Sequence, residues 1–151
     1  ALLLNIATAQ AEPLRPFVPG SAEEIRRAHA GERYLLTLWS LTCTHCAAEL
    51  ALLGKLREKH PGLILVLVST DTPGDNEALR AVLREHGLER TEAWVFADDY
   101  SERLRYELDP RWHGELPRSY LHGRDGSVRA VSGRLDASEL DRWLAAPPGK
   151  P

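Results

Sequence analysis

The chain has only two cysteines, and they stand two residues apart, at Cys43 and Cys46. The mostly apolar residues 34–39 before them are typical of a buried strand, and residues 47–60 after them have the apolar spacing of a helix. A Cys-x-x-Cys pair at the junction of a strand and a helix is the arrangement of a thiol–disulfide redox site. The spacing therefore predicts two thiols that close and open a disulfide reversibly.

We expect Cys43 to be the attacking thiol. It precedes the helix, where unpaired backbone N–H groups and the helix dipole favour a thiolate, so its sulfur should be more exposed and more acidic than that of Cys46. Cys46 lies one turn further and should resolve the mixed disulfide by attacking Cys43. The alternative is a structural disulfide, but so small a loop constrains the unfolded chain little.

Two ionisable side chains lie within one helical turn of the cysteines. His45 stands at the helix N-terminus, where a partly charged imidazole would favour the thiolate and raise the reduction potential; alternatively it is an exposed histidine without effect. Glu49 follows Cys46 by three residues and shares its helix face. An ionised carboxylate there raises a thiol pKa and serves as a base for the thiol proton, unless Glu49 is merely an exposed helix glutamate.

The rest of the sequence predicts one domain in which strands and helices alternate. Residues 14–20 are an extended, proline-rich lead, residues 21–24 form a capping box that opens a first helix, and Asp136 caps the last helix. In between we expect helices at residues 47–60, 78–86 and 100–108, and strands at residues 34–39, 63–68, 93–96, 118–122 and 128–132. This order, which ends in a hairpin, indicates a mixed sheet covered by helices.

The N-terminal residues differ in character from the rest of the chain. Residues 1–8 are apolar, and residues 9–11 have the Ala-x-Ala form of a signal-peptidase site. Either residues 1–12 are the remnant of a signal peptide or membrane anchor, or they are an apolar lead-in that packs on the domain. The first interpretation places the expected domain, residues 13–146, outside the cytoplasm, where disulfides persist. Residues 147–151 are expected to be a flexible tail.

The composition excludes other classes of protein. A length of 151 residues, with 43% hydrophobic and 27% charged side chains, suits one globular domain. The 22 acidic side chains outnumber the 19 basic ones and give a net charge of −3, so nucleic acid is not expected as a partner. No stretch approaches the roughly 20 consecutive apolar residues of a membrane span.

The motifs together resemble those of a known family. Residues 39–49 are similar to the active-site signature of the TlpA/ResA/CcmG-like bacterial thiol–disulfide oxidoreductases, and Leu116-Pro117 before the hairpin and Gly133 after it resemble the thioredoxin fold. Residues 94–108 match the extra strand and helix of that subgroup. The resemblance implies an α/β thioredoxin fold: a central mixed β-sheet flanked by helices, with a strand–helix insertion before the C-terminal hairpin.

The resemblance also implies a surface for substrate. Pro117 matches a family proline whose peptide bond is usually cis and which holds the preceding backbone, here Leu116, beside the attacking cysteine for a substrate strand to pair with. The alternative is a trans proline that starts an edge strand. Thr42 stands at the partner-contact position, where the family often has tryptophan. Thr37 replaces a buried aspartate of thioredoxins, which leaves Glu49 as the candidate for its role.

These observations predict an enzyme, a thiol–disulfide oxidoreductase that uses no cofactor and acts on protein thiols and disulfides. The resemblance favours an extracytoplasmic reductase that a membrane dithiol carrier re-reduces, whereas His45 favours an oxidase or isomerase. A further alternative is a copper-binding or copper-delivery module in which the two cysteines are thiolate ligands. Its nitrogen ligand would be His45, His113 or His122, but the sequence has no second Cys/His pair for a closed four-ligand site.

Overall fold

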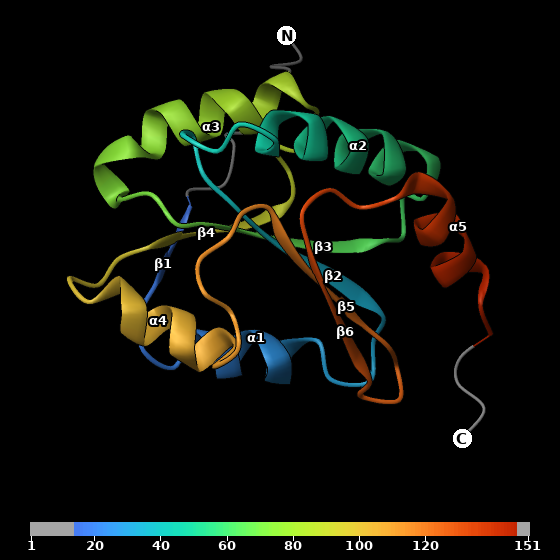
Figure 1. Cartoon of the computed structure of the whole chain (residues 1–151). Coiled ribbons are helices and arrows are strands. Elements are labelled where there is room, and N and C mark those ends of the chain that lie inside the picture. Colours follow the sequence, from blue (N-terminus) through green and yellow to red (C-terminus); the bar gives the residue numbers. More distant parts are fainter. Residues whose placement is uncertain (1–13, 148–151) are drawn as a thin grey trace, which may run out of the picture.

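The computed structural model describes residues 14–147 and has a sheet between two layers of helices (Figure 1). This arrangement confirms the predicted mixed sheet that is flanked by helices. The segment predicted to be a signal or anchor remnant, residues 1–12, lies outside the described residues, as does all but Pro147 of the predicted tail. Within residues 14–147, no helix is both long enough and apolar enough to cross a membrane.

The sheet has six strands in the order β1-β4-β3-β2-β5-β6. The strands are β1 (Arg15–Phe17), β2 (Tyr34–Trp39), β3 (Ile64–Ser69), β4 (Glu92–Phe96), β5 (Arg118–His122) and β6 (Val128–Ser132). The first four pair in parallel, and β5 pairs antiparallel with both β2 and β6. The carboxyl ends of the neighbouring strands β2 and β3 therefore meet at one edge of the sheet.

Helices cover both faces of the sheet (Figure 1). One face carries α2 (Cys46–Lys59), α3 (Asn76–Glu85) and α5 (Ala137–Ala145), and the other carries α1 (Ser21–Ala28) and α4 (Ser101–Leu108). A short 3-10 helix, η1 (Pro73–Asp75), precedes α3. Each face has its own hydrophobic core, because the strands send apolar side chains in both directions.

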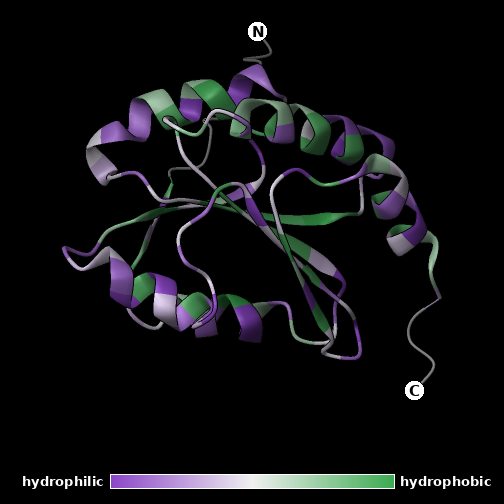
Figure 2. Cartoon of the chain, viewed as in Figure 1, coloured by the Kyte–Doolittle hydropathy of each residue, from purple (hydrophilic) through white to green (hydrophobic). Residues whose placement is uncertain are grey.

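Strand β2 is buried along its whole length and contributes to both cores. Leu35 and Trp39 pack in the core next to α2, whereas Leu36 and Leu38 pack in the core next to α1. This alternation follows from the two-residue period of a strand. Figure 2 shows largely hydrophobic strands in the middle of the molecule and helices in which hydrophobic and hydrophilic residues alternate. Thr37 has the same parity as Leu35 and is therefore a buried polar residue on the α2 side.

The edge strand β1 was not predicted from the sequence, which indicates only an extended lead at residues 14–20. Arg15–Phe17 instead pairs in parallel with β4. The central residue of β1, Pro16, has no N–H to donate, and proline is tolerated at a sheet edge because one side of the strand needs no partner. β4 and α4 form the predicted strand–helix insertion, and β4 lies between β1 and β3.

The first helix begins differently from the predicted capping box. The N-cap of α1 is Gly20, not Ser21, and its φ of 94° is a conformation that side chains disfavour. Ser21 lies inside the helix, and its Oγ accepts a hydrogen bond from the N–H of Val18 at 3.0 Å. The predicted cap of α5 is confirmed, because the Asp136 carboxylate accepts from the N–H of Glu139 at 2.9 Å.

Candidate functional site

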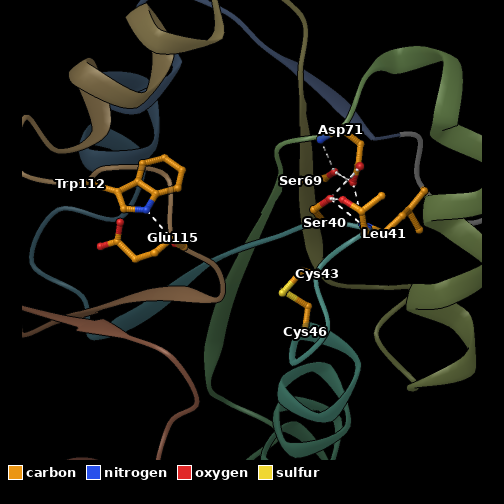
Figure 3. Close-up of a disulfide and its surroundings, with 9 residues drawn as sticks. Ser40, Leu41, Cys43, Cys46, Ser69, Asp71, Trp112 and Glu115 are labelled. Atoms are coloured by element: carbon orange, nitrogen blue, oxygen red, sulfur yellow. Dashed lines mark hydrogen bonds between the residues drawn. A yellow bond between two sulfur atoms is a disulfide. The ribbon is translucent and has the colours of Figure 1, made fainter.

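Cys43 and Cys46 form a disulfide at the point where β2 leads into α2 (Figure 3). Cys46 is the first residue of α2, and His45 is its N-cap. Cys43, in the preceding turn, is partly exposed, whereas Cys46 is only 1% exposed. The predicted difference in exposure is confirmed. A sulfur atom of another molecule would reach Cys43 first, at a helix end that stabilises a thiolate.

The loop that carries Cys43 is held by a carboxylate that follows the neighbouring strand. The Asp71 carboxylate accepts hydrogen bonds from Ser40 Oγ at 2.9 Å and from Ser69 Oγ at 2.7 Å (Figure 3). It also accepts the N–H of Leu41 at 3.0 Å. We call Ser40, Ser69 and Asp71 the loop brace. Because the N–H of Cys43 donates to the Ser40 carbonyl at 3.3 Å, the brace fixes the backbone directly before the disulfide.

The loop brace includes a residue that the sequence analysis missed. Asp71 lies in a segment predicted only to be a turn, although it follows β3 just as the cysteine loop follows the adjacent parallel strand β2. Thr42, the predicted partner contact, is exposed between the brace and the disulfide. Its N–H donates to Ser40 Oγ at 3.2 Å, and its Oγ1 lies 3.1 Å from the same atom.

Glu49 lies one helical turn after Cys46 and is 0% exposed, so the interpretation of Glu49 as an exposed helix glutamate is wrong. Its two carboxylate oxygens lie 3.1 and 3.3 Å from the N–H of Leu135, which donates to them. Burial raises the pKa of Glu49 above its ordinary value, while the Leu135 N–H, the charge of Arg134 and the hydroxyl of Ser119 act in the opposite direction. The carboxyl group therefore keeps its proton to a higher pH than an ordinary glutamate does.

Two hydroxyl groups complete a polar cluster on this side of the sheet. Thr37 Oγ1 and Ser119 Oγ lie 2.9 Å apart across the β2–β5 pair, and both side chains are buried. The Ser119 hydroxyl also lies near enough to Glu49 to lower the pKa of its carboxyl group. We call Thr37, Glu49 and Ser119 the basal cluster. Ser119 was missed by the sequence analysis, because its position opposite Thr37 depends on the register of the two strands.

The Leu116–Pro117 peptide bond is cis. Pro117 is buried, and its carbonyl accepts the N–H of Gly133 at 2.8 Å, which joins the start of β5 to the end of β6. Leu116 and Cys43 both pack against the core next to α2. That Leu116, Pro117 and Thr42 contact a substrate stays a prediction.

The loop before Pro117 is held by its own side chains. Trp112 Nε1 donates to the carbonyl of Glu115 at 2.8 Å, as Figure 3 shows. Arg118 donates to the Asp109 carboxylate at 2.7 Å and to Ser132 Oγ at 2.7 Å. These bonds fix the conformation of the segment that precedes Pro117.

The three histidines considered as copper ligands do not gather at the cysteines. His45 is exposed beside the pair, His113 lies in the exposed loop before β5, and His122 lines a cavity on the other face of the sheet. Among the residues that the structure describes, no group of three or more His, Cys, Asp and Glu side chains is arranged to hold a metal ion. No cofactor-binding role is assigned to the site residues.

No protein-family model and no curated protein matches the sequence. The structure is similar to that of a secreted disulfide oxidoreductase from Mycobacterium tuberculosis, which is homologous to DsbE of Escherichia coli. The two sequences are 20% identical, the match covers 79% of this chain and 84% of that chain, and the TM-score is 0.63. StoA from Bacillus subtilis has 21% identity, coverage of 76% and 84%, and a TM-score of 0.54. A thio-disulfide isomerase from Thermus thermophilus has 20% identity, coverage of 92% and 99%, and a TM-score of 0.58.

These similarities confirm the predicted thioredoxin-like fold. The structural neighbours are thioredoxin-like thiol–disulfide oxidoreductases, and the TlpA/ResA/CcmG-like resemblance is consistent with them. Because only about one residue in five is identical, these structural neighbours establish the fold of the chain and not its activity. What the chain does has to be argued from its own side chains.

Proposed function

Because the chain has the fold of disulfide oxidoreductases and carries a Cys-x-x-Cys disulfide, we propose that it is a thiol–disulfide oxidoreductase that reduces protein disulfides outside the cytoplasm. One observation carries the proposal. Cys43 is partly exposed at the N-terminus of α2, and Cys46, which is 1% exposed, lies directly behind it. This asymmetry gives one thiol access to a partner and leaves the other to resolve the mixed disulfide.

The reaction begins with both cysteines reduced. The Cys43 thiolate attacks one sulfur of a substrate disulfide, so a mixed disulfide forms and the other substrate sulfur leaves as a thiolate. The Cys46 thiolate then attacks Cys43 Sγ, which releases the second substrate thiolate and forms the Cys43–Cys46 disulfide. Two electrons pass from the protein to the substrate, and the protons of the two cysteines leave for solvent or substrate. A membrane dithiol carrier would restore the reduced state by the reverse exchange.

Glu49 fits the role of base for Cys46. The resolving thiol is buried and must lose its proton before it can attack. Glu49 is on the same face of α2, one turn away, and its carboxyl group has a raised pKa because it is buried. A carboxylate with a raised pKa binds a thiol proton more readily than an ordinary one does.

The substrate would pair with the backbone beside the disulfide. Thr42 is exposed directly before Cys43, and Leu116 packs against the same core as Cys43. An extended peptide that lies between these residues could add hydrogen bonds to the Leu116 backbone, as strand-adding ligands do. Recognition through backbone groups suits a protein that must accept several unfolded or extended partners.

The reducing direction is favoured by the surroundings of the cysteines. Glu49 lies one helical turn after Cys46, and Asp71 holds the loop before Cys43, whereas His45 is exposed, where solvent weakens its influence. Once ionised, these carboxylates disfavour a nearby thiolate, and a less stable thiolate makes the dithiol a better reductant. A location outside the cytoplasm is supported by the secreted M. tuberculosis protein and by the signal-peptidase pattern at residues 9–11.

The reduction potential of the Cys43–Cys46 pair, measured by equilibration with glutathione buffers, tests the direction. We expect a value near that of thioredoxin, roughly −270 mV. A value nearer to −120 mV would assign the protein to oxidation or isomerisation. A pair that does not cycle would reject the redox proposal, and stoichiometric copper on protein purified without reductant would then favour the copper-binding module.

Two matched variants test the roles of the cysteines. Incubated with insulin as a disulfide substrate, reduced Cys46→Ser should accumulate a mixed disulfide through Cys43, because the resolving thiol is missing. Cys43→Ser should form almost none, because Cys46 is buried. Equal trapping by both variants would contradict the assignment of Cys43 as the attacking thiol.

A further inference from the structure

A cavity of about 370 Å³ lies on the face of the sheet that is opposite to the disulfide. It is bounded by α1, by the residues that follow α4 and by strands β2, β5 and β6. Its volume falls within the roughly 300–1,000 Å³ that is common for small-molecule sites. None of its lining residues belongs to the cysteine pair, the loop brace or the basal cluster.

The floor of the cavity consists of two rows of side chains that run across three strands. The rows are Leu36–Tyr120–Ala130 and Tyr34–His122–Val128. The floor is open at the β6 edge, where Ala130 is exposed and Val128 is 54% exposed. Most of this surface is aliphatic or aromatic, so it suits an apolar group that enters from the side of β6.

Two polar side chains of this floor have no hydrogen-bond partner in the described part of the chain. Tyr34 is only 3% exposed, yet its hydroxyl bonds to none of residues 14–147. The His122 ring stacks on Tyr34 with its centroid 4.0 Å away, and its nitrogens are equally without partners in that range. Neither the Tyr34 hydroxyl nor the His122 nitrogens are among the fully enclosed unpaired atoms of the described residues, so a ligand in the cavity can reach them.

The lining of the cavity is positive. Arg26, Arg111 and Arg118 line it together with a single carboxylate, that of Asp109. Burial raises the pKa of Tyr34 to about 12 and lowers the pKa of His122 to about 4, and the charge of Arg26 contributes to the electrostatics of both groups. The Arg26 guanidinium therefore lies near the two unpartnered side chains.

The opposite wall is already satisfied by its own hydrogen bonds. Arg118 donates to the Asp109 carboxylate at 2.7 Å and to the Tyr120 hydroxyl at 3.1 Å, and that hydroxyl donates to Asp109 at 3.1 Å. These three residues form a rigid wall whose charges cancel. The remaining positive charge of the lining comes from Arg111 and from Arg26, which shares the single Glu23 carboxylate with Arg27. Arg26, Tyr34 and His122 line the same cavity.

We propose that this cavity binds a small organic carboxylate. Its apolar body lies on Leu36 and Ala130, and its carboxylate accepts hydrogen bonds from Arg26 and from the Tyr34 hydroxyl. The carboxylate supplies the acceptor that Tyr34 lacks and the negative charge that the lining lacks. The proposal does not depend on the redox activity, because the cavity and the disulfide share no residue.

Titration of the oxidised, ¹⁵N-labelled protein with 3-phenylpropanoate tests the proposal. Saturable amide shifts are expected at Tyr34, His122 and Ala130, with binding at least roughly tenfold tighter than that of the uncharged 3-phenylpropanamide, which lacks the charge-assisted contact. Octanoate distinguishes the source of the apolar body. Tighter binding than that of 3-phenylpropanoate assigns an aliphatic acid, and weaker binding assigns an aromatic one.

Two arginines provide a matched pair of variants. Arg26 and Arg27 both donate to the Glu23 carboxylate at 3.0 Å, but only Arg26 lines the cavity. Arg26→Gln should weaken 3-phenylpropanoate binding about tenfold, and Arg27→Gln should leave it unchanged. Ala130→Leu, at an exposed position, should abolish binding by filling the cavity without changing the reduction potential of the disulfide.

Three results would overturn the proposal: equal binding of the carboxylate and the amide, shifts that stay linear up to the solubility limit, or equal effects of Arg26→Gln and Arg27→Gln. If Ala130→Leu destabilises the protein, Tyr34→Phe replaces it as the second variant, because it removes only the hydroxyl. None of these results bears on the redox proposal, which is tested at the Cys43–Cys46 pair.

Discussion

The loop brace and the basal cluster each place a carboxylate near the disulfide, but they satisfy it in different ways. Asp71 accepts from two hydroxyl groups and one backbone N–H and is partly exposed. Glu49 is 0% exposed, and within residues 14–147 its carboxylate accepts from the N–H of Leu135. One carboxylate organises a loop, whereas the other is buried with few donors.

This difference suggests how structural and chemical tasks are divided. A carboxylate with several donors holds those donors in place, so its main effect is on the conformation of the loop. A buried carboxylate with few donors has a raised pKa and so takes up a proton more readily than a well-solvated carboxylate, which suits it to proton exchange. We therefore expect the loss of Asp71 to reduce mainly stability and the loss of Glu49 to reduce mainly turnover.

The largest effect is expected for Asp71→Ala. The unfolding free energy of the oxidised protein should fall by about 3 kcal/mol, because Ser40, Leu41 and Ser69 lose their common acceptor. Urea denaturation measures the change. Asp75→Ala is the control, since Asp75 bonds only to exposed Thr72, and its loss should stay below about 1 kcal/mol. Equal losses for the two variants would contradict the assignment of the brace.

The next largest effect is expected for Glu49→Gln. Turnover should fall roughly tenfold to a hundredfold, because an amide cannot take the proton of Cys46. Rapid-quench measurement of mixed-disulfide decay places the loss in the resolving step, with little change in the first attack by Cys43. Glu58→Gln, an exposed position on the same helix, is the matched control and should behave like the unmodified protein. A slower first attack in Glu49→Gln would speak against the role as base.

The smallest effect concerns the pH dependence of stability. The pKa of Glu49 is higher in the folded than in the unfolded protein. The contribution of Glu49 to the free energy of unfolding is therefore fully present at pH values below its pKa in the unfolded protein. This contribution is lost as the pH rises through its pKa in the folded protein. Glu49→Gln removes this loss. Urea denaturation at several pH values should show the variant gaining stability relative to the unmodified protein as pH rises from acidic to neutral. A constant difference would contradict the raised pKa.

Much of this architecture could be predicted from the sequence. Strands β2, β5 and β6 begin and end at the predicted residues, because apolar runs and a Gly-rich turn mark them locally. The cysteine pair at the strand–helix junction was equally local information. Asp71 could have been found too, because two strands joined by a helix are usually parallel neighbours, and the residues that follow such strands meet at one edge of the sheet.

Other features depend on contacts between distant segments. β1 has only three residues, and its pairing with β4 cannot be read from a sequence that contains Pro16. Ser119 joins the basal cluster only because the register of β5 places it opposite Thr37. Likewise, Tyr34 looks like an ordinary core residue until the register puts His122 beside it over a cavity.

The short strand β1 also affects how the folded molecule behaves at high concentration. An exposed sheet edge is a template on which another chain can add a strand, and such addition leads to aggregation. At the β1 edge, three residues offer little length for pairing, and Pro16 withholds one N–H. The β1 edge is thereby protected from adding strands of other chains, including copies of this protein.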